Sequence, residues 1–393
     1  MATHVETVGR VRSRRRTLVG SVLVALGAIL LVGAPIWRFA VAPELIKFPT
    51  DVDQSLTYEG TLRLFVDPAT ATPLAEPTEL TMTVERDVVA DSDASGANTV
   101  VIDETITIEA EGLAPLEQRF RYVMDRSDAE NVADDRAFAY DEANVIDRSG
   151  TWRLALPQDV DADETYPIYK NETADAVLAQ AAADDPTGEL DGLDVINLAA
   201  TTEPTQVTDA YVASISTLVP LPDTLTVDGL RPVLAQAGLD LDALVAELGP
   251  ALGEAELGAL TAALDAEVAI TYLDGVTSTD AVEQRTGAVV DVQTVQEMLV
   301  AQPDVTALAG FAELLQPFAD VPAVADAMAA VAGLEATTIP VFELDYAQTP
   351  ASTEDLVAEV KDQLSAIDWW SVRSPSPPPG SGSCSSSPAS PCS

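Results

Sequence analysis

The sequence predicts a mainly β protein of the α+β class, in which an N-terminal transmembrane helix precedes an extracytoplasmic antiparallel β-sheet domain with helical insertions. Three observations predict this fold class. Residues 17–36 form an uncharged run that follows a cluster of arginines. From Ser55 onward, apolar and polar residues alternate in several short runs, as half-buried strands require. Two Leu- and Ala-rich stretches, about 227–264 and 305–334, have helical spacing instead.

The beginning of the chain divides into a basic cytoplasmic segment, residues 1–16, and a predicted transmembrane helix, residues 17–41. Twenty uncharged residues rise about 30 Å as a helix, which matches the hydrocarbon core of a bilayer. Because basic residues are favoured on the cytoplasmic side, the preceding arginines determine the topology. They are Arg10, Arg12, Arg14, Arg15 and Arg16. We therefore expect a single-pass plasma-membrane protein in contact with membrane lipid, with its N-terminus cytoplasmic and its bulk extracytoplasmic.

Two aromatic residues, Trp37 and Phe39, follow the uncharged run, where aromatic side chains mark the membrane interface. A signal peptide cleaved after Ala42 is the alternative, because Ala40-Val41-Ala42 resembles the small-residue cleavage site. The apolar region of a signal peptide spans about 7–15 residues, which is shorter than this run. The length therefore favours an uncleaved anchor.

The charge of the chain is strongly acidic, with a net value of -44 from 64 acids and 20 bases. Six of the bases but only one acid, Glu6, precede Ala42, so the remainder is more acidic still. Nucleic-acid binding depends on Lys and Arg that neutralise phosphates, so we expect no nucleic-acid partner. The simplest role of such a surface is hydration.

Period-two alternation predicts strands within a β-rich domain at residues 44–351. The first run places Leu56, Tyr58, Leu62, Leu64 and Val66 on one face. Further runs are ELTMTVER, ETITIEA, RFRYVMD, TWRLALP and AEVAITYL. Turn residues in LFVDPATATPLA, YVMDRSDAENV and VEQRTGAVVDV predict three hairpins, with Gly287 giving the last turn its backbone freedom. Together these runs predict an antiparallel sheet with one wet face.

The helical stretches at about 227–264 and 305–334 are insertions between strands. Their apolar stripes either dock on the sheet or cover the mouth of an apolar cavity. The last predicted element is an amphipathic juxtamembrane helix at residues 352–370, for which Ser352 and Asp355 fit a capping box. It ends in Trp369 and Trp370, which we expect at the membrane interface.

The order of these parts resembles the actinobacterial PorA-like (porin PorA) family. The motifs that carry the resemblance are VDPAT, DGLDV, VEQRTGAVVDVQTVQE and TEDLVAEVKDQLS, within about residues 8–370. The resemblance implies a membrane-anchored envelope protein with a porin label and a second transmembrane helix after the paired tryptophans. Here a Ser/Pro low-complexity tail, residues 371–393, stands in its place. We interpret it as a frame-shifted reading, with a genuine flexible tail as the alternative.

Catalytic and metal-binding residues are not predicted. The single histidine is His4, and the two cysteines, Cys384 and Cys392, lie in the tail, so Ser-His, Cys-His and Cys-type zinc chemistry are excluded from the β-rich domain. The acidic loop from Asp159 lacks the Gly and the final Glu of a calcium loop, since Glu164 and Lys170 occupy those positions.

The sequence therefore predicts a non-enzymatic, membrane-anchored extracytoplasmic envelope protein without a cofactor that binds a hydrophobic or lipid ligand. The alternatives are a channel-forming porin and a structural interaction module. A channel built from one helix per chain would need a homo-oligomer, so self-association stays open.

Overall fold

The computed structural model of the 393-residue chain describes residues 47–182, 184–236, 239–250, 252–304, 306, 313–321, 324–325, 328 and 338–373. The chain divides into two compact units. One unit is Phe48–Val360, and the other combines Met1–Lys47 with Lys361–Ser393. All of the described strands belong to the unit Phe48–Val360.

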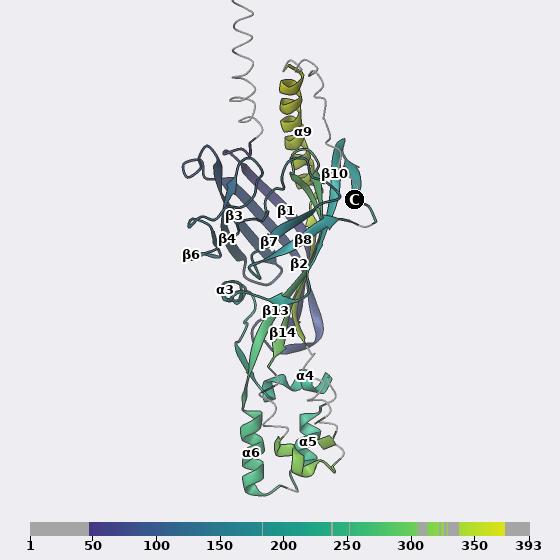
Figure 1. Cartoon of the computed structure of the whole chain (residues 1–393). Coiled ribbons are helices and arrows are strands. Elements are labelled where there is room, and N and C mark those ends of the chain that lie inside the picture. Colours follow the sequence, from purple (N-terminus) through teal and green to yellow (C-terminus); the bar gives the residue numbers. More distant parts are fainter. Residues whose placement is uncertain are drawn as a thin grey trace, which may run out of the picture. The chain divides into compact units, whose positions relative to one another are not determined.

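Within the described residues, 15 strands form one antiparallel sheet (Figure 1). The strands are β1 Asp53–Val66, β2 Pro73–Ala90, β3 Thr99–Ala110, β4 Leu116–Asp125, β5 Phe138–Ala139, β6 Asp141–Val145, β7 Thr165–Lys170, β8 Asp175–Ala181, β9 Thr187–Leu190, β10 Leu193–Thr201, β11 Thr205–Gln206, β12 Thr224–Thr226, β13 Glu267–Glu283, β14 Val289–Pro303 and β15 Ile339–Gln348. Their order is β6-β5-β4-β3-β2-β1-β15-β14-β13-β10-β8-β7, while β9 pairs with β10 and both β11 and β12 pair with β13.

The strand β15 joins two parts of the sheet that are far apart in the sequence. It pairs with β1 on one side and with β14 on the other. At the contact with β1, Gly60 lies opposite Tyr346, and a Cβ at position 60 would lie 2.1 Å from the carbonyl oxygen of Asp345. The absence of a side chain at Gly60 therefore permits this close approach of the two backbones.

The predicted alternation is confirmed for the first strand. In β1 the five apolar residues of the alternating run are exposed by 6% or less, and they belong to the largest hydrophobic cluster. The first and last predicted hairpins are also present, as β1–β2 and β13–β14. The prediction for TWRLALP was wrong: Trp152 and Ala155 form isolated bridges to Ile168 and Ala288 instead of a continuous strand.

Among the described residues, the helical elements are α3 Asp209–Ile215, η2 Asp228–Leu230, α4 Arg231–Gln236, α5 Leu241–Leu248, α6 Glu254–Leu264, η4 Gln316–Phe318 and α9 Pro350–Arg373. The predicted helical insertion at about 227–264 is thus confirmed. Of the second predicted insertion, at about 305–334, much lies outside the described residues.

The apolar residues of α5 belong to the hydrophobic cluster that continues into the sheet. Leu241, Leu244 and Leu248 are buried in one cluster with Val268 of β13 and Ile339 of β15. In Figure 1 the helices α4, α5 and α6 lie beyond the ends of the β13–β14 hairpin. Among the described residues, none from these three helices lines the cavity described below.

The C-terminal helix begins two residues earlier than predicted. Thr349 precedes it, and the hydroxyl of Thr349 accepts a hydrogen bond from the backbone nitrogen of Ser352 at 3.4 Å. Ser352 therefore does not cap the helix. Its hydroxyl instead accepts a hydrogen bond from the backbone nitrogen of Thr57 at 2.9 Å, which ties the start of α9 to β1.

The predicted fold class requires a correction. Among the helices that the structure describes, none is both long and apolar enough to cross a membrane. The longest, α9, has 24 residues but carries acidic residues and Lys361 along its length. This part of the chain is mainly an antiparallel sheet with few helices. The segments predicted as a basic arm, residues 1–16, and as a transmembrane helix, residues 17–41, lie outside the described residues.

The predicted single-pass plasma-membrane localisation, with a cytoplasmic N-terminus and an extracytoplasmic bulk, is corrected on the same finding. The juxtamembrane role given to residues 352–370 stays a prediction. The structure confirms the helix itself as α9.

Candidate functional site

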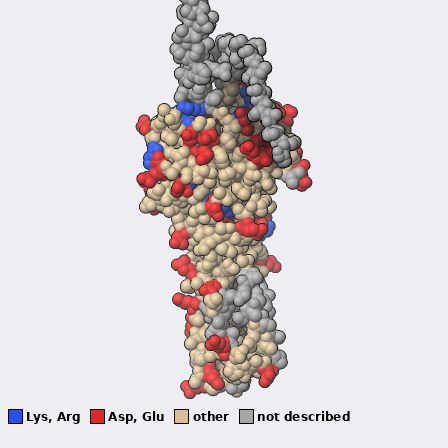
Figure 2. Space-filling model, viewed as in Figure 1, with Lys and Arg blue, Asp and Glu red and all other residues tan. Residues whose placement is uncertain are grey.

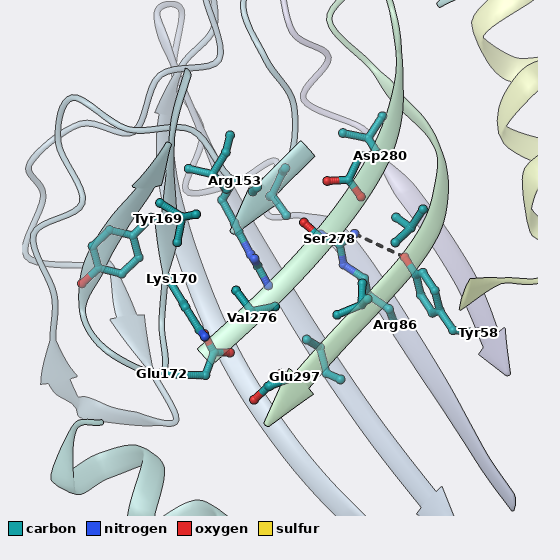
Figure 3. A pocket seen from close by; sticks show the side chains of 18 of the residues that line it. Tyr58, Arg86, Arg153, Tyr169, Lys170, Glu172, Val276, Ser278, Asp280 and Glu297 are labelled. Carbon is teal, nitrogen blue, oxygen red and sulfur yellow. Dashed lines mark hydrogen bonds between the residues drawn. The ribbon is translucent and has the colours of Figure 1, made fainter. Parts of the chain in front are cut away.

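A cavity of about 210 Å³ lies within the unit Phe48–Val360, against one face of the sheet (Figure 3). Its lining comes from β1–β4, β7, β8, β10 and β13–β15, together with α3 and the segment 153–156. Because side chains of a strand alternate between faces, residues two apart point into it together. Val276, Ser278 and Asp280 of β13 are an example.

The lining combines apolar side chains with charged ones. Six charged residues take part: Arg86, Arg153, Lys170, Glu172, Asp280 and Glu297. Figure 3 shows Arg153 extended into the cavity. Lys170 and Glu172 lie on one side of it, and Glu297 of β14 and Asp280 of β13 lie on the other. Charged groups away from bulk water are costly unless they are paired or bound by a ligand, so each needs a partner.

Arg86 is paired through a buried network. Its Nε lies 2.5 Å from Oε1 of Glu104, and Oε2 of Glu104 accepts a hydrogen bond from the hydroxyl of Tyr122 at 2.7 Å. Burial by itself would raise the pKa of Glu104, but Arg86, Arg153 and these hydrogen bonds lower it below its ordinary value. Glu104 therefore stays ionised and holds Arg86 in place.

Arg148 extends this network to the other end of the sheet. The side-chain nitrogen of Asn171 donates to the hydroxyl of Tyr122 at 2.9 Å, while its oxygen accepts from Nη2 of Arg148 at 2.9 Å. Arg148 also donates to the carbonyl oxygens of Arg121 and Phe138. Side chains, rather than a strand ladder, thus connect β4 and β5 with the turn after β7.

Lys170 forms a buried ion pair with Asp274 of β13. Two further acids lie near this lysine: Glu297, which accepts a hydrogen bond from the hydroxyl of Tyr211 at 2.9 Å, and Glu172. Burial and the repulsion from Glu297 raise the pKa of Asp274, and burial and Glu172 raise the pKa of Glu297. Because one lysine faces three acids, this group favours the uptake of a proton.

Arg86, Lys170 and Glu297 have side-chain partners, whereas the side chains of Arg153, Asp280 and Glu172 make no hydrogen bond or ion pair with another described residue. The Nε of Arg153 is buried without a partner. Burial lowers the pKa of Arg153, but Tyr122, Glu104 and Glu172 outweigh this effect, so the guanidinium stays charged. Burial raises the pKa of Asp280 to about 6, against the opposing effect of Arg153 and Arg86.

Backbone contacts hold the segment that carries Arg153. The backbone nitrogen of Leu156 donates to the carbonyl oxygen of Gly287 at 2.8 Å, and that of Val160 donates to Gln284 at 2.7 Å. The β13–β14 turn therefore fixes this segment against the sheet. Across the described residues, no group of three or more His, Cys, Asp or Glu could hold a metal ion.

The structure does not test the site residues singled out from the sequence. Trp37, Phe39 and the arginine cluster lie outside the described residues, and Trp369 and Trp370 belong to α9, with side chains that are not described. Sequence reasoning missed the charged lining residues, although a signal was present. Arg86 follows Leu80, Met82 and Val84 at the same period of two, which places a charge on the inward face.

The fold and the cavity together define a mainly antiparallel β protein with a charged, partly apolar interior. A family model described as Porin PorA matches residues 19–376. The chain therefore belongs to the PorA porin family, which confirms the resemblance seen in the sequence at the level of the family. Comparison with functionally curated proteins gave no match.

Proposed function

We propose that the protein acts as a channel-forming porin for small solutes and has no enzymatic activity. The observation that supports this proposal best is the family match, which spans residues 19–376. The interior is compatible with it, because charged side chains line space that the core does not fill. The absence of catalysis is proposed because the single histidine is His4 and both cysteines belong to residues 384–392.

The cavity of about 210 Å³ in one chain is too small to be a complete conduction path. We therefore propose that several copies of the chain surround the path. Acidic groups near Lys170 and a net charge of -44 would favour cations over anions, as acidic rings do in cation channels.

The experiment is planar-bilayer recording with the detergent-purified full-length protein. We expect discrete conductance steps and a reversal potential that favours K⁺ over Cl⁻ in a salt gradient. The double variant Glu172→Gln and Glu297→Gln should reduce this preference, whereas Glu117→Gln, an exposed change on β4, should not. Failure of the wild-type protein to conduct over a range of protein concentrations would overturn the channel proposal.

The second candidate is binding of a hydrophobic or amphiphilic molecule. The observation that favours it is the apolar part of the cavity lining, which includes Ile106, Ile108 and Leu198. Ligand sites are commonly concave, mostly apolar and furnished with a few polar groups, and this cavity has that composition. Solvent extraction and mass spectrometry of the purified full-length protein should release a bound amphiphile. A protein that is purified without one, and that binds none added later, would exclude this candidate.

A further inference from the structure

We infer that the cavity binds an amphiphile with a single carboxylate head, and that Arg153 binds this carboxylate while the chain of the ligand lies against the apolar wall. This inference rests on the binding candidate above and names the ligand class and the anchoring residue.

Arg153 is the cation of the lining that has no bonded acceptor among the described residues. Arg86 is paired with Glu104, and Lys170 is paired with Asp274. A guanidinium has five N–H donors in a fixed planar arrangement, and the buried Nε of Arg153 has no partner. A carboxylate accepts two parallel hydrogen bonds from such a group, so it matches Arg153 in both charge and shape.

The apolar wall gives the ligand its second part. Six aliphatic side chains from five strands contribute: Val84, Ile106, Ile108, Ile168, Val177 and Leu198. A cavity of about 150 Å³ lined by such side chains accepts benzene, so a cavity of about 210 Å³ accommodates roughly eight to nine heavy atoms. The eight carbons of octanoate match this number, and its two carboxylate oxygens would lie against Arg153, so octanoate is a suitable probe.

The acids of the lining limit the charge of the head group. Glu172, Asp280 and Glu297 line the same cavity as Arg153. A head with two negative charges, such as a phosphate monoester, would be repelled more strongly by these acids. The described lining offers no second unpaired cation to offset that repulsion. A single carboxylate carries only one negative charge, so these acids repel it less than they repel a phosphate monoester. A protonated Asp280 or Glu297 could also donate a hydrogen bond to the carboxylate.

Binding of octanoate, octyl phosphate, octylamine and octanol to the purified full-length protein tests this inference by isothermal titration calorimetry. We expect octanoate to bind most tightly. Arg153→Gln should weaken octanoate binding at least about tenfold, because a charge-assisted bidentate interaction is lost. Arg119→Gln is the matched control, since the side chain of Arg119 is 53% exposed and Arg119 is not among the lining residues. It should leave the affinity unchanged.

Circular dichroism and thermal melting establish whether each variant is folded. If Arg153→Gln does not fold, Arg153→Lys replaces it: this variant keeps the charge but loses the planar fork, so it should weaken octanoate while leaving octanol binding unchanged. Tighter binding of octylamine than of octanoate would overturn the inference. So would an unchanged octanoate affinity in the folded Arg153 variant.

The outcome also separates this inference from the function on which it rests. One outcome is that equal amounts of amphiphile are extracted from the wild-type protein and from Arg153→Gln. That result would leave the binding function intact but refute the role of Arg153. No extracted amphiphile and no binding of any of the four probes would refute the binding function itself. Extraction of a carboxylate amphiphile from the wild type, with loss from the variant, is the supporting result.

Discussion

Arg148 illustrates how one side chain can join distant parts of a sheet. It is 2% exposed, and its nitrogens donate to the side-chain oxygen of Asn171 and to the carbonyl oxygens of Phe138 and Arg121. Its guanidinium carbon lies 4.5 Å from the centre of the Tyr122 ring, which adds a cation–π contact. Removing this group would leave several buried acceptors without their donor.

We predict that Arg148→Met lowers the free energy of unfolding by about 3–5 kcal/mol, because the buried donors are lost while the aliphatic stem is kept. Urea denaturation followed by circular dichroism measures the change. Arg119→Met is the control, because the ion pair of Arg119 with Glu142 is exposed and 3.7 Å long. That control should change stability by no more than about 0.5 kcal/mol. Equal losses in both variants would show that Arg148 does not join the two ends of the sheet.

Asp280 gives a prediction of pH dependence. Its pKa is about 6 in the folded protein and its ordinary value is 3.8, so the folded state holds this proton more tightly than the unfolded state. The resulting stabilisation is present below about pH 4 and is lost as the pH rises through 6. Ionised Asp280 therefore costs stability at alkaline pH.

Asp280→Asn should raise the free energy of unfolding at pH 8 by up to about 3 kcal/mol, since the pKa shift from 3.8 to about 6 is worth about 1.4 kcal/mol per unit. The gain over the wild type should disappear near pH 4. Urea denaturation at the two pH values measures it. Glu117→Gln, an exposed change on β4, should show no such difference. A gain for Asp280→Asn that is the same at both pH values would contradict the assignment.

At the scale of elements, the β13–β14 turn determines the position of the segment that carries Arg153. Gly287 has a φ of +72°, and a Cβ at this position would lie 2.2 Å from the carbonyl oxygen of Leu156. Both the left-handed backbone and the close contact thus exclude a side chain. The sequence indicated the left-handed backbone, because Gly is typical of such turns. It did not indicate the close contact, because Leu156 is distant along the chain.

Gly287→Ala should therefore destabilise the protein more than a change at an uncrowded glycine. Gly112 is the matched control: its φ is +82°, but no atom lies within 4 Å of an added Cβ. We expect Gly112→Ala to cost about 1–2 kcal/mol from backbone strain alone, and Gly287→Ala to cost at least about 1 kcal/mol more. Thermal and urea denaturation of the two variants compare them. A cost at Gly112 equal to or above that at Gly287 would contradict the close packing of the turn on Leu156.

Elements were predictable where the pattern is local. The period of two identified β1, because its inward residues are all apolar, and the helical spacing identified α5 and the helix now seen as α9. The pattern failed at Trp152–Leu156, where alternating residues lie beside other strands but form only isolated bridges. Alternation indicates the face on which a side chain lies. It does not indicate whether a neighbouring strand forms a continuous set of backbone hydrogen bonds with the segment.

For the whole molecule, the dominant property is its charge of -44. Figure 2 shows acidic side chains spread over the visible described surface, with few basic ones between them. Mutual repulsion of these acids destabilises the compact state, and dissolved salt screens it over a distance of about 10 Å at about 0.1 M. Stability should therefore depend on ionic strength.

We predict that the midpoint of thermal unfolding rises when NaCl is increased from about 10 mM to about 300 mM, since the screening length falls several-fold over this range. KCl should have the same effect, because screening depends on ionic strength and not on a specific ion. Sucrose, at the same osmolality as the higher salt, controls for osmotic effects and should not reproduce the rise in full. An unchanged or lower midpoint in both salts would show that repulsion between the acids does not limit stability.

The sequence by itself determined the properties that depend on local pattern and on composition: strands with one buried face, helical insertions, an acidic surface and the family resemblance. The tertiary structure decided the order of the strands and the existence of the cavity. Lys170 and Asp274 are 104 residues apart, and they meet because β7, β8, β10 and β13 are neighbours in the sheet. A period of two specifies the face on which a side chain lies, but the partner of each strand depends on long-range packing. The sequence therefore indicated an inward charge at Arg86, but only the tertiary structure showed which charged side chains meet in the interior.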